Sequence, residues 1–217
     1  MSAAWTVLAL GLILAPLATC AEEAPPLTRE QALARIATGD VEIRRQAVAR
    51  LGDVGTMPDV PALTRALSDP DEVTRGLAEQ SVWQVWSRSG DPAIDALFQL
   101  GLAQLNQGDP EAAIETFTTI IDKKPDFAEG WNKRATIFFL VGEYQKSLRD
   151  CDEVLKRNPT HWGVLAGYGQ IYLQLDQPER ALGYFQRALA INPNLRQVEA
   201  AVEQLKRLIA DKRRDTI

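Results

Sequence analysis

The chain has 217 residues, 46% of them hydrophobic, which is enough to bury a continuous core in one domain or two small ones. Aromatic residues make up only 7% of the sequence, and its many Ala, Leu, Gln, Glu and Arg residues favour α-helices over a β-sandwich or barrel. The formal net charge of −5 argues against a general nucleic-acid binder, which needs a concentrated Lys/Arg face.

The first segment, residues 1–21, is set apart by its composition. An uncharged apolar run from Trp5 to Leu14 is followed by Pro16 and then by small residues up to Ala21. This pattern resembles a bacterial signal peptide, although no Lys or Arg precedes the run. It predicts a periplasmic or secreted protein, and the alternative is an uncleaved membrane anchor.

Cys20 has two possible fates. The segment Leu17-Ala18-Thr19-Cys20 resembles the lipobox of bacterial lipoproteins, but Thr19 departs from the Gly, Ala or Ser that this pattern prefers before the cysteine. Cys20 is therefore either lipidated or removed with the signal peptide. If it is removed, Cys151 is the sole cysteine left and no intramolecular disulfide can form, so we expect Cys151 to be an inert packing residue.

Residues 22–92 contain a period of 31 residues. The segment 40–51 returns as 71–82, and Pro61 returns as Pro92. Each unit reads as a helix opened by an Asp, a short turn, and a second helix that starts at a Pro. The pattern resembles the short HEAT-like repeat of bacterial proteins, in which Asp and Arg pair across neighbouring repeats. A short helix from Thr28 to about Ala37 is expected to cap the first pair.

Trp83 and Trp86 lie three residues apart on the last helix of this region. Tryptophan usually fills large irregular gaps, so we expect both rings to be buried at the joint with the following array. An exposed binding surface is the alternative.

From residue 94 the period becomes 34, with repeats at 94–127, 128–161 and 162–195. Small residues recur at the eighth position (Gly101, Ala135, Gly169) and at the twentieth (Ala113, Ser147, Ala181), and prolines recur at the thirty-second (Pro125, Pro159, Pro193). Small residues at these two positions let antiparallel helices approach closely. The region 93–195 is similar to three tetratricopeptide repeats, and this resemblance implies an all-α fold, a right-handed α-solenoid of stacked helix pairs.

The last segment, residues 196–217, predicts a capping helix with a basic tail. Val198, Val202, Leu205 and Ile209 recur at helical spacing. Such a stripe covers the open face of the last repeat while the charged side chains stay in water.

The tetratricopeptide resemblance implies that partners bind in a concave groove lined by the first helix of each pair. The groove residues that we single out are Phe98, Leu102, Leu105, Asn132, Thr136, Phe139, Gln170 and Leu173. Most are apolar, while Asn132 and Gln170 can hydrogen-bond a peptide backbone. The preceding helices could instead cover Phe98 and Leu102. These two residues stand where the family's carboxylate clamp needs Lys and Asn, so that function is not carried over.

The sequence predicts no catalytic, cofactor-binding or metal-binding residues. His161 is the sole histidine, and a turn position of this kind is usually exposed. The leading hypothesis is an exported scaffold that binds a protein or peptide and no nucleic acid, with membrane contact only through lipidated Cys20 or an uncleaved signal. The alternative is a non-enzymatic structural or regulatory subunit of an envelope complex or of a homo-oligomer.

Overall fold

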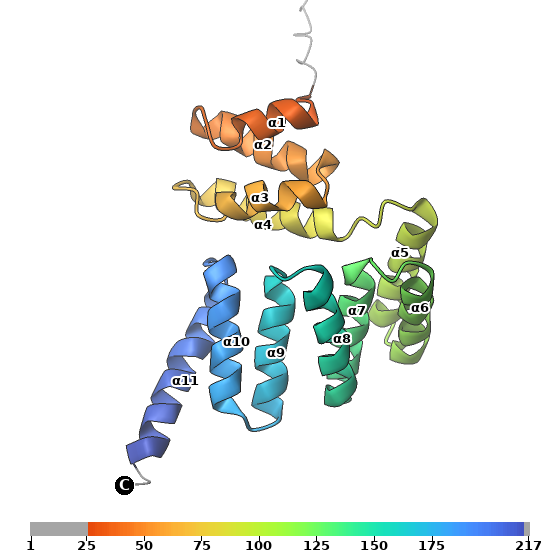
Figure 1. Ribbon diagram of the computed structural model, residues 1–217, viewed down its shortest axis with the longest axis vertical. Helices are drawn as coiled ribbons and strands as arrows, with labels where there is room; N and C mark the ends of the chain where they lie inside the picture. Colours follow the sequence, from red (N-terminus) through yellow and green to blue (C-terminus); the bar gives the residue numbers. More distant parts are fainter. Residues whose placement is uncertain (1–25, 215–217) are drawn as a thin grey trace, which may run out of the picture.

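The computed structural model of the protein describes residues 26–214, and this part of the chain folds into helices joined by short turns (Figure 1). The elements are α1 (Arg29–Arg35), α2 (Val41–Val54), the 3₁₀ turn η1 (Met57–Asp59), α3 (Val60–Ala66), α4 (Glu72–Trp86), α5 (Pro92–Asn106), α6 (Pro110–Lys123), α7 (Ala128–Leu140), α8 (Tyr144–Arg157), α9 (Trp162–Gln174), α10 (Pro178–Ile191) and α11 (Arg196–Arg214). The expected all-α array of helix pairs is confirmed within these residues. Residues 1–21, the expected signal peptide, and Cys20 within them lie outside the described part of the chain.

None of the helices in the described part of the chain has the length and the apolar composition needed to cross a membrane.

The helices begin where capping chemistry places them. The Asp40 carboxylate accepts the backbone N–H of Ile43 at 2.9 Å, and Asp71 accepts that of Thr74 at 2.8 Å. These bonds satisfy amide groups that have no partner inside the first turn of a helix. Pro92 is the first residue of α5, where the missing N–H of proline is harmless.

The N-terminal helices form two layers, with α1 packed on α2, α3 packed on α4, and α2 stacked on α4. Bidentate ion pairs join successive segments at their edges. Arg44 Nε lies 2.7 Å from Asp69 Oδ2, and Arg45 Nη2 lies 2.8 Å from Asp71 Oδ1. Planar pairs of this kind fix the register as well as adding energy.

The three pairs α5/α6, α7/α8 and α9/α10 follow the 34-residue period. Within the first pair, a Cβ atom on Gly101 would lie 2.7 Å from the ring of Phe117, so the glycine makes room for this ring. The turns repeat as well. Gly108, Gly142 and Asp176 occupy equivalent positions and have φ angles of 79°, 80° and 50°. The family pattern thus sets both the packing and the turn geometry.

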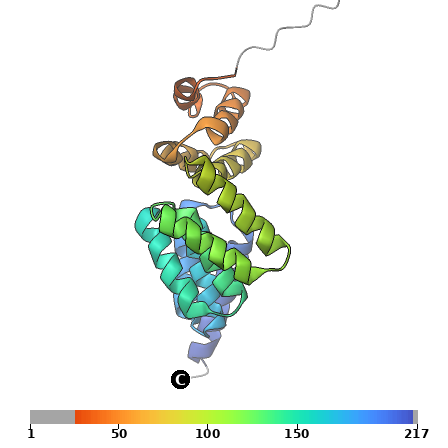
Figure 2. The same ribbon diagram turned by 90° about the vertical axis from the view of Figure 1, so that its right-hand side faces the viewer.

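The N-terminal helices do not extend the row of repeats by stacking end-on against repeat one. In Figure 1, α3 and α4 run across the ends of α7–α10, and Figure 2 shows the same arrangement from the side. Trp86 of α4 shares a buried core with Trp162, Leu165 and Ala188 of repeat three. Asn194 Nδ2 donates to the carbonyl of Leu67 at 2.8 Å. The N-terminal helices therefore pack on the last repeat, 127 residues away along the chain.

At the C-terminal end, α11 packs against α10. Val202 and Leu205 are buried in the same core cluster as Phe185 of α10, while Leu208 is exposed. The helix therefore closes the apolar face of repeat three with one side and presents the other to solvent.

Candidate functional site

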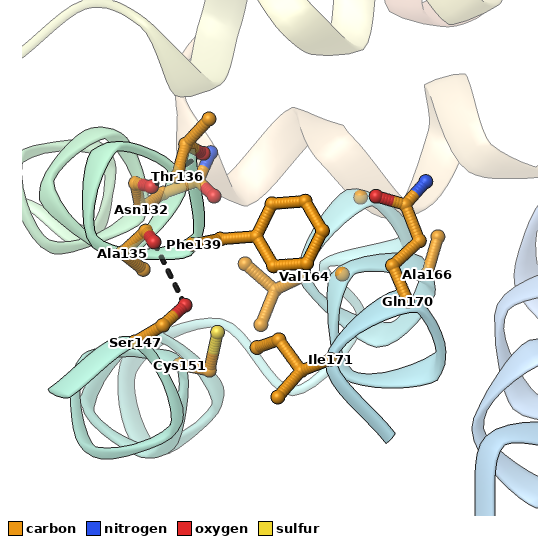
Figure 3. A pocket seen from close by; sticks show the side chains of 12 residues that line it. Asn132, Ala135, Thr136, Phe139, Ser147, Cys151, Val164, Ala166, Gln170 and Ile171 are labelled. Carbon is orange, nitrogen blue, oxygen red and sulfur yellow. Dashed lines mark hydrogen bonds between the residues drawn. The ribbon is translucent and has the colours of Figure 1, made fainter. Parts of the chain in front are cut away.

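A pocket of about 160 Å³ opens between α7 and α9, the first helices of repeats two and three. Figure 3 shows the side chains that line it. They are Asn132, Ala135, Thr136 and Phe139 of α7, Ser147 and Cys151 of α8, and Gly163, Val164, Ala166, Gly167, Gln170 and Ile171 of α9. Four of the groove residues expected from the sequence, Asn132, Thr136, Phe139 and Gln170, thus meet at one place.

The α7 side of the pocket follows from helical spacing. Residues 132, 135, 136 and 139 are three or four positions apart, which places their side chains on one face of the helix. The ring of Phe139 reaches across the space between α7 and α9 towards Val164 and Ile171 (Figure 3). Phe139 is half-buried, so one part of the ring remains open to a ligand.

The floor of the pocket belongs to α8 and is apolar in character. The Ser147 hydroxyl donates to the backbone carbonyl of Ala135 at 2.7 Å, so its polar hydrogen is already used. Burial raises the pKa of the Cys151 thiol to about 12. The thiol therefore stays protonated at neutral pH and behaves as a small apolar group rather than a nucleophile.

The α9 side of the pocket includes three small residues, Gly163, Ala166 and Gly167. A Cβ atom on Gly163 would lie 2.6 Å from the ring of Trp83, so α9 approaches α4 closely at this residue. Gly167 faces open space: within the described residues, an added Cβ would meet no atom closer than 4 Å. Small side chains here leave the volume that a ligand side chain can fill.

The polar groups of the pocket differ in availability. Gln170 is exposed, and its side chain makes no hydrogen bond to any residue between 26 and 214. Thr136 is exposed, although its hydroxyl donates to the carbonyl of Asn132 at 2.9 Å. Asn132 is buried, and its Nδ2 donates to Glu129 Oε2 at 2.8 Å. The amide of Gln170 at the rim is therefore available to a ligand, whereas the amide of Asn132 is already hydrogen-bonded to Glu129.

The other groove residues lie apart from this pocket. Phe98 is buried in the core of repeat one, with ring centroids 5.8 Å from Phe117 and 5.6 Å from Phe127. Leu102 and Leu105 are half-buried against the same core. Phe98 is thus unavailable to a partner in this fold, and its own repeat covers it rather than the preceding helices. Leu173 is exposed on α9 but does not line the pocket.

The expectation that His161 faces solvent was wrong. Its ring is fully buried, stacks on Trp86 at a centroid distance of 4.2 Å, and lies 2.6 Å from a carboxylate oxygen of Glu129. Trp86 is buried at the joint between the N-terminal helices and the array, as expected, whereas Trp83 is only half-buried there. Glu129 lies in the first turn of α7, and His161 caps the start of α9, 32 residues later. Neither segment's sequence pattern indicates that the two side chains pair.

Within residues 26–214, no three His, Cys, Asp or Glu side chains lie close enough together to hold a metal ion.

Comparison with known proteins identifies relatives for the helix pairs of the repeats. Tetratricopeptide repeat family models match residues 98–161 and 139–205. A TPR repeat-containing protein of Rhizobium etli is 32% identical over 145 residues, which is 67% of this chain and 70% of the relative.

Two solved structures are similar in fold. The first TPR domain of Spaghetti (RPAP3), bound to the HSP90 peptide SRMEEVD, matches 54% of this chain and 93% of its own length with a TM-score of 0.52 and 20% identity. A crystal structure of MamA matches 80% of this chain and 86% of its own length with a TM-score of 0.51 and 14% identity. At these identities the likeness concerns the arrangement of the helices alone.

Proposed function

This chain belongs to the tetratricopeptide repeat family, and on that premise we propose that it is an exported, non-catalytic scaffold that binds a segment of a partner protein between α7 and α9. Modules of this family serve protein–protein interaction. The observation that supports binding between α7 and α9 is the apolar pocket there, with the half-buried Phe139 at its side.

The composition of the pocket defines the kind of segment that fits. Phe139, Val164 and Ile171 offer apolar contact, and the volume of about 160 Å³ suits a single aliphatic side chain. The free amide of Gln170 at the rim can hydrogen-bond the backbone of the same segment. The ligand that we propose is therefore a peptide segment that inserts one Leu, Ile, Val or Met side chain.

An acidic chain end like the one bound by the RPAP3 domain is not part of this proposal. Phe98 and Leu102 occupy the positions where a carboxylate clamp needs Lys and Asn, and Phe98 is buried. Apolar groups at these positions cannot donate hydrogen bonds to a carboxylate.

We also propose that residues 22–92 are HEAT-like repeats and that residues 1–21 direct export. Support for the first comes from the ion pair Arg45–Asp71, which joins the unit that begins at Asp40 to the unit that begins at Asp71. Support for the second comes from the amino-acid sequence of residues 1–21 alone. The mass of the N-terminal peptide of the mature protein tests export and distinguishes removal of Cys20 from its lipidation.

Affinity capture from the cell-envelope fraction tests the binding proposal. We expect wild-type protein to retain a partner that Phe139→Glu loses, because a carboxylate in the apolar pocket is costly to desolvate. Leu140→Glu is the matched control, since Leu140 is the adjacent, exposed residue and does not line the pocket. Equal capture by all three proteins would refute the pocket. Native mass spectrometry of the same samples separates partner binding from self-assembly.

A further inference from the structure

A second pocket, of about 260 Å³, lies at the joint between the two parts of the molecule. Met57, Trp86 and Arg88 line it from the N-terminal helices, and residues of the α6–α7 turn and of the end of α8 line it from the repeats. It shares no lining residue with the pocket between α7 and α9. Whatever binds here therefore leaves the proposed peptide site free.

Two buried N–H donors in the lining have no acceptor within residues 26–214. They are the indole Nε1 of Trp86 and the amide Nδ2 of Asn158, whose residues are only 3% and 4% exposed. The orientation of the Asn158 amide is fixed, because its Oδ1 accepts from both the backbone N–H and the hydroxyl of Thr160. The Nδ2 end of the amide therefore points away from Thr160. A buried donor without a partner costs about 1–3 kcal/mol, so a bound acceptor would be favoured.

The same lining is rich in cations. Arg88, Lys124 and Arg157 line it together with two carboxylates, those of Asp126 and Glu129. The Glu129 carboxylate is already engaged by His161 and Asn132. The half-buried Lys124 ammonium forms no ion pair or hydrogen bond with any described residue. The pocket thus offers one unused ammonium group, beside two lining residues that each carry a buried neutral donor without a partner.

We propose that this joint pocket binds a carboxylate group. Arg157 is already paired with Glu153, and Arg88 donates to the backbone carbonyls of Asp53 and Gly52, so Lys124 is the cation left for a ligand. Its single charge matches a singly charged carboxylate better than a doubly charged phosphate. Met57, Phe127 and the ring of Trp86 supply apolar walls for the carbon atoms attached to it. The carboxylate belongs either to a small organic acid or to the C-terminus of a peptide.

Because the lining comes from both parts of the chain, the ligand also bridges them. A molecule that binds the folded joint and not the separated parts stabilises the joint by mass action.

The indole resonance of Trp86 in ¹H–¹⁵N spectra reports binding directly. It is identified as the indole peak that Trp86→Phe lacks, a substitution that keeps an aromatic ring beside His161. The probes are acetate, a pentapeptide ending in leucine with a free C-terminus, the same pentapeptide with a C-terminal amide, and inorganic phosphate. We expect a saturable shift of the Trp86 peak with acetate, with the free-acid pentapeptide or with both, and none with the amide.

The two acids separate the possible sources. Binding of acetate alone assigns the site to small organic acids, and binding of the pentapeptide alone assigns it to chain ends. Lys124→Glu should weaken binding roughly tenfold or more, equivalent to at least about 1.4 kcal/mol. Lys123→Glu is the matched control: Lys123 is the exposed neighbour, lies outside the lining, and should leave affinity within about twofold. The proposal is overturned if neither acid shifts the peak, if the amide shifts it equally, if only phosphate does, or if both lysine variants behave alike.

Discussion

Nε2 of His161 lies 2.6 Å from Oε1 of Glu129, and both side chains are fully buried. Nδ1 of the same ring accepts the backbone N–H of Val164 at 3.1 Å and so caps α9. Because Nδ1 is an acceptor, the proton resides on Nε2 and is donated to the carboxylate. The His161 side chain thus connects the first turn of α7 to the first turn of α9.

This pair predicts how stability depends on pH. Burial raises the pKa of the Glu129 carboxyl, but His161, Lys133 and Asn132 together outweigh burial and hold it below its ordinary value of 4.5. Ionised Glu129 therefore contributes stability that is fully present above pH 4.5 and is lost as the pH falls through the lower folded-state pKa.

We expect Glu129→Gln to lower the free energy of unfolding at pH 7 by about 1–3 kcal/mol. Urea denaturation at pH 7 and at about pH 3.5 measures the difference between variant and wild type, which should shrink at the lower pH. A difference that is equal at the two pH values would contradict the assignment of the negative charge to Glu129.

Two glycines inside helices should respond oppositely to alanine. A Cβ atom on Gly169 would lie less than 3.0 Å from the ring of Phe185, whereas one on Gly183 would meet no described atom within 4 Å. Gly183→Ala should therefore stabilise the protein by about 0.5–1 kcal/mol through the better helix propensity of alanine. Gly169→Ala should destabilise it by about 1–3 kcal/mol, because the overpacked ring has to move. Thermal denaturation of both variants checks the opposite signs, and equal shifts would argue against the close approach of α9 and α10.

Asp176 occupies a turn position where the two preceding repeats have glycine. Its φ of 50° lies in the left-handed region, as do those of Gly108 and Gly142. A side chain in this region is strained, and aspartate is only partly tolerant of it. Asp176→Gly should raise the free energy of unfolding by about 0.5–1 kcal/mol, and Gly142→Asp should lower it by a similar amount. Denaturant titration of the two variants measures both changes.

The C-terminal helix offers a test of its attachment. Leu205 is 5% exposed and packs in the core shared with α10, while Leu208, almost one turn later, is 44% exposed. Leu205→Ala should cost about 2–5 kcal/mol of stability because it leaves a cavity. Leu208→Ala should change stability by no more than about 0.5 kcal/mol, as is usual for surface sites. Similar losses for the two variants would mean that α11 is held by a different face.

Much of the helix order was predictable because its signals are local. Asp40 and Asp71 cap the helices that follow them, and Pro92 starts α5. The 34-residue period located the three family pairs because close packing needs small residues, such as Gly101 beside Phe117, at fixed intervals.

The pocket was only partly predictable. Numbering along the repeat placed Thr136, Phe139 and Gln170 on the side of the array where the pocket opens. It could not place Phe98, which occupies the same repeat position as Asn132. The rings of Phe117 and Phe127 provide an apolar space for Phe98 inside repeat one. Whether a large side chain turns inward depends on such neighbours, and these are not adjacent in the sequence.

The position of the N-terminal helices was beyond the reach of the periodicity. A repeat pattern predicts that each unit stacks on the next. Trp86, however, contacts Trp162 with ring centroids 4.4 Å apart, so α4 packs on repeat three rather than on repeat one alone. The same contact buries His161, which a turn position alone would leave in water.

The hydrogen bond from Asn194 to Leu67 changes how this molecule should come apart. In an open row of repeats the terminal units can fray while the middle persists, because each unit touches only its neighbours. Here the N-terminal helices pack on the last repeat, so unfolding of either one removes contacts that stabilise the other. We therefore expect one cooperative melting transition, and a newly synthesised chain completes its packing only after its last repeat has left the ribosome.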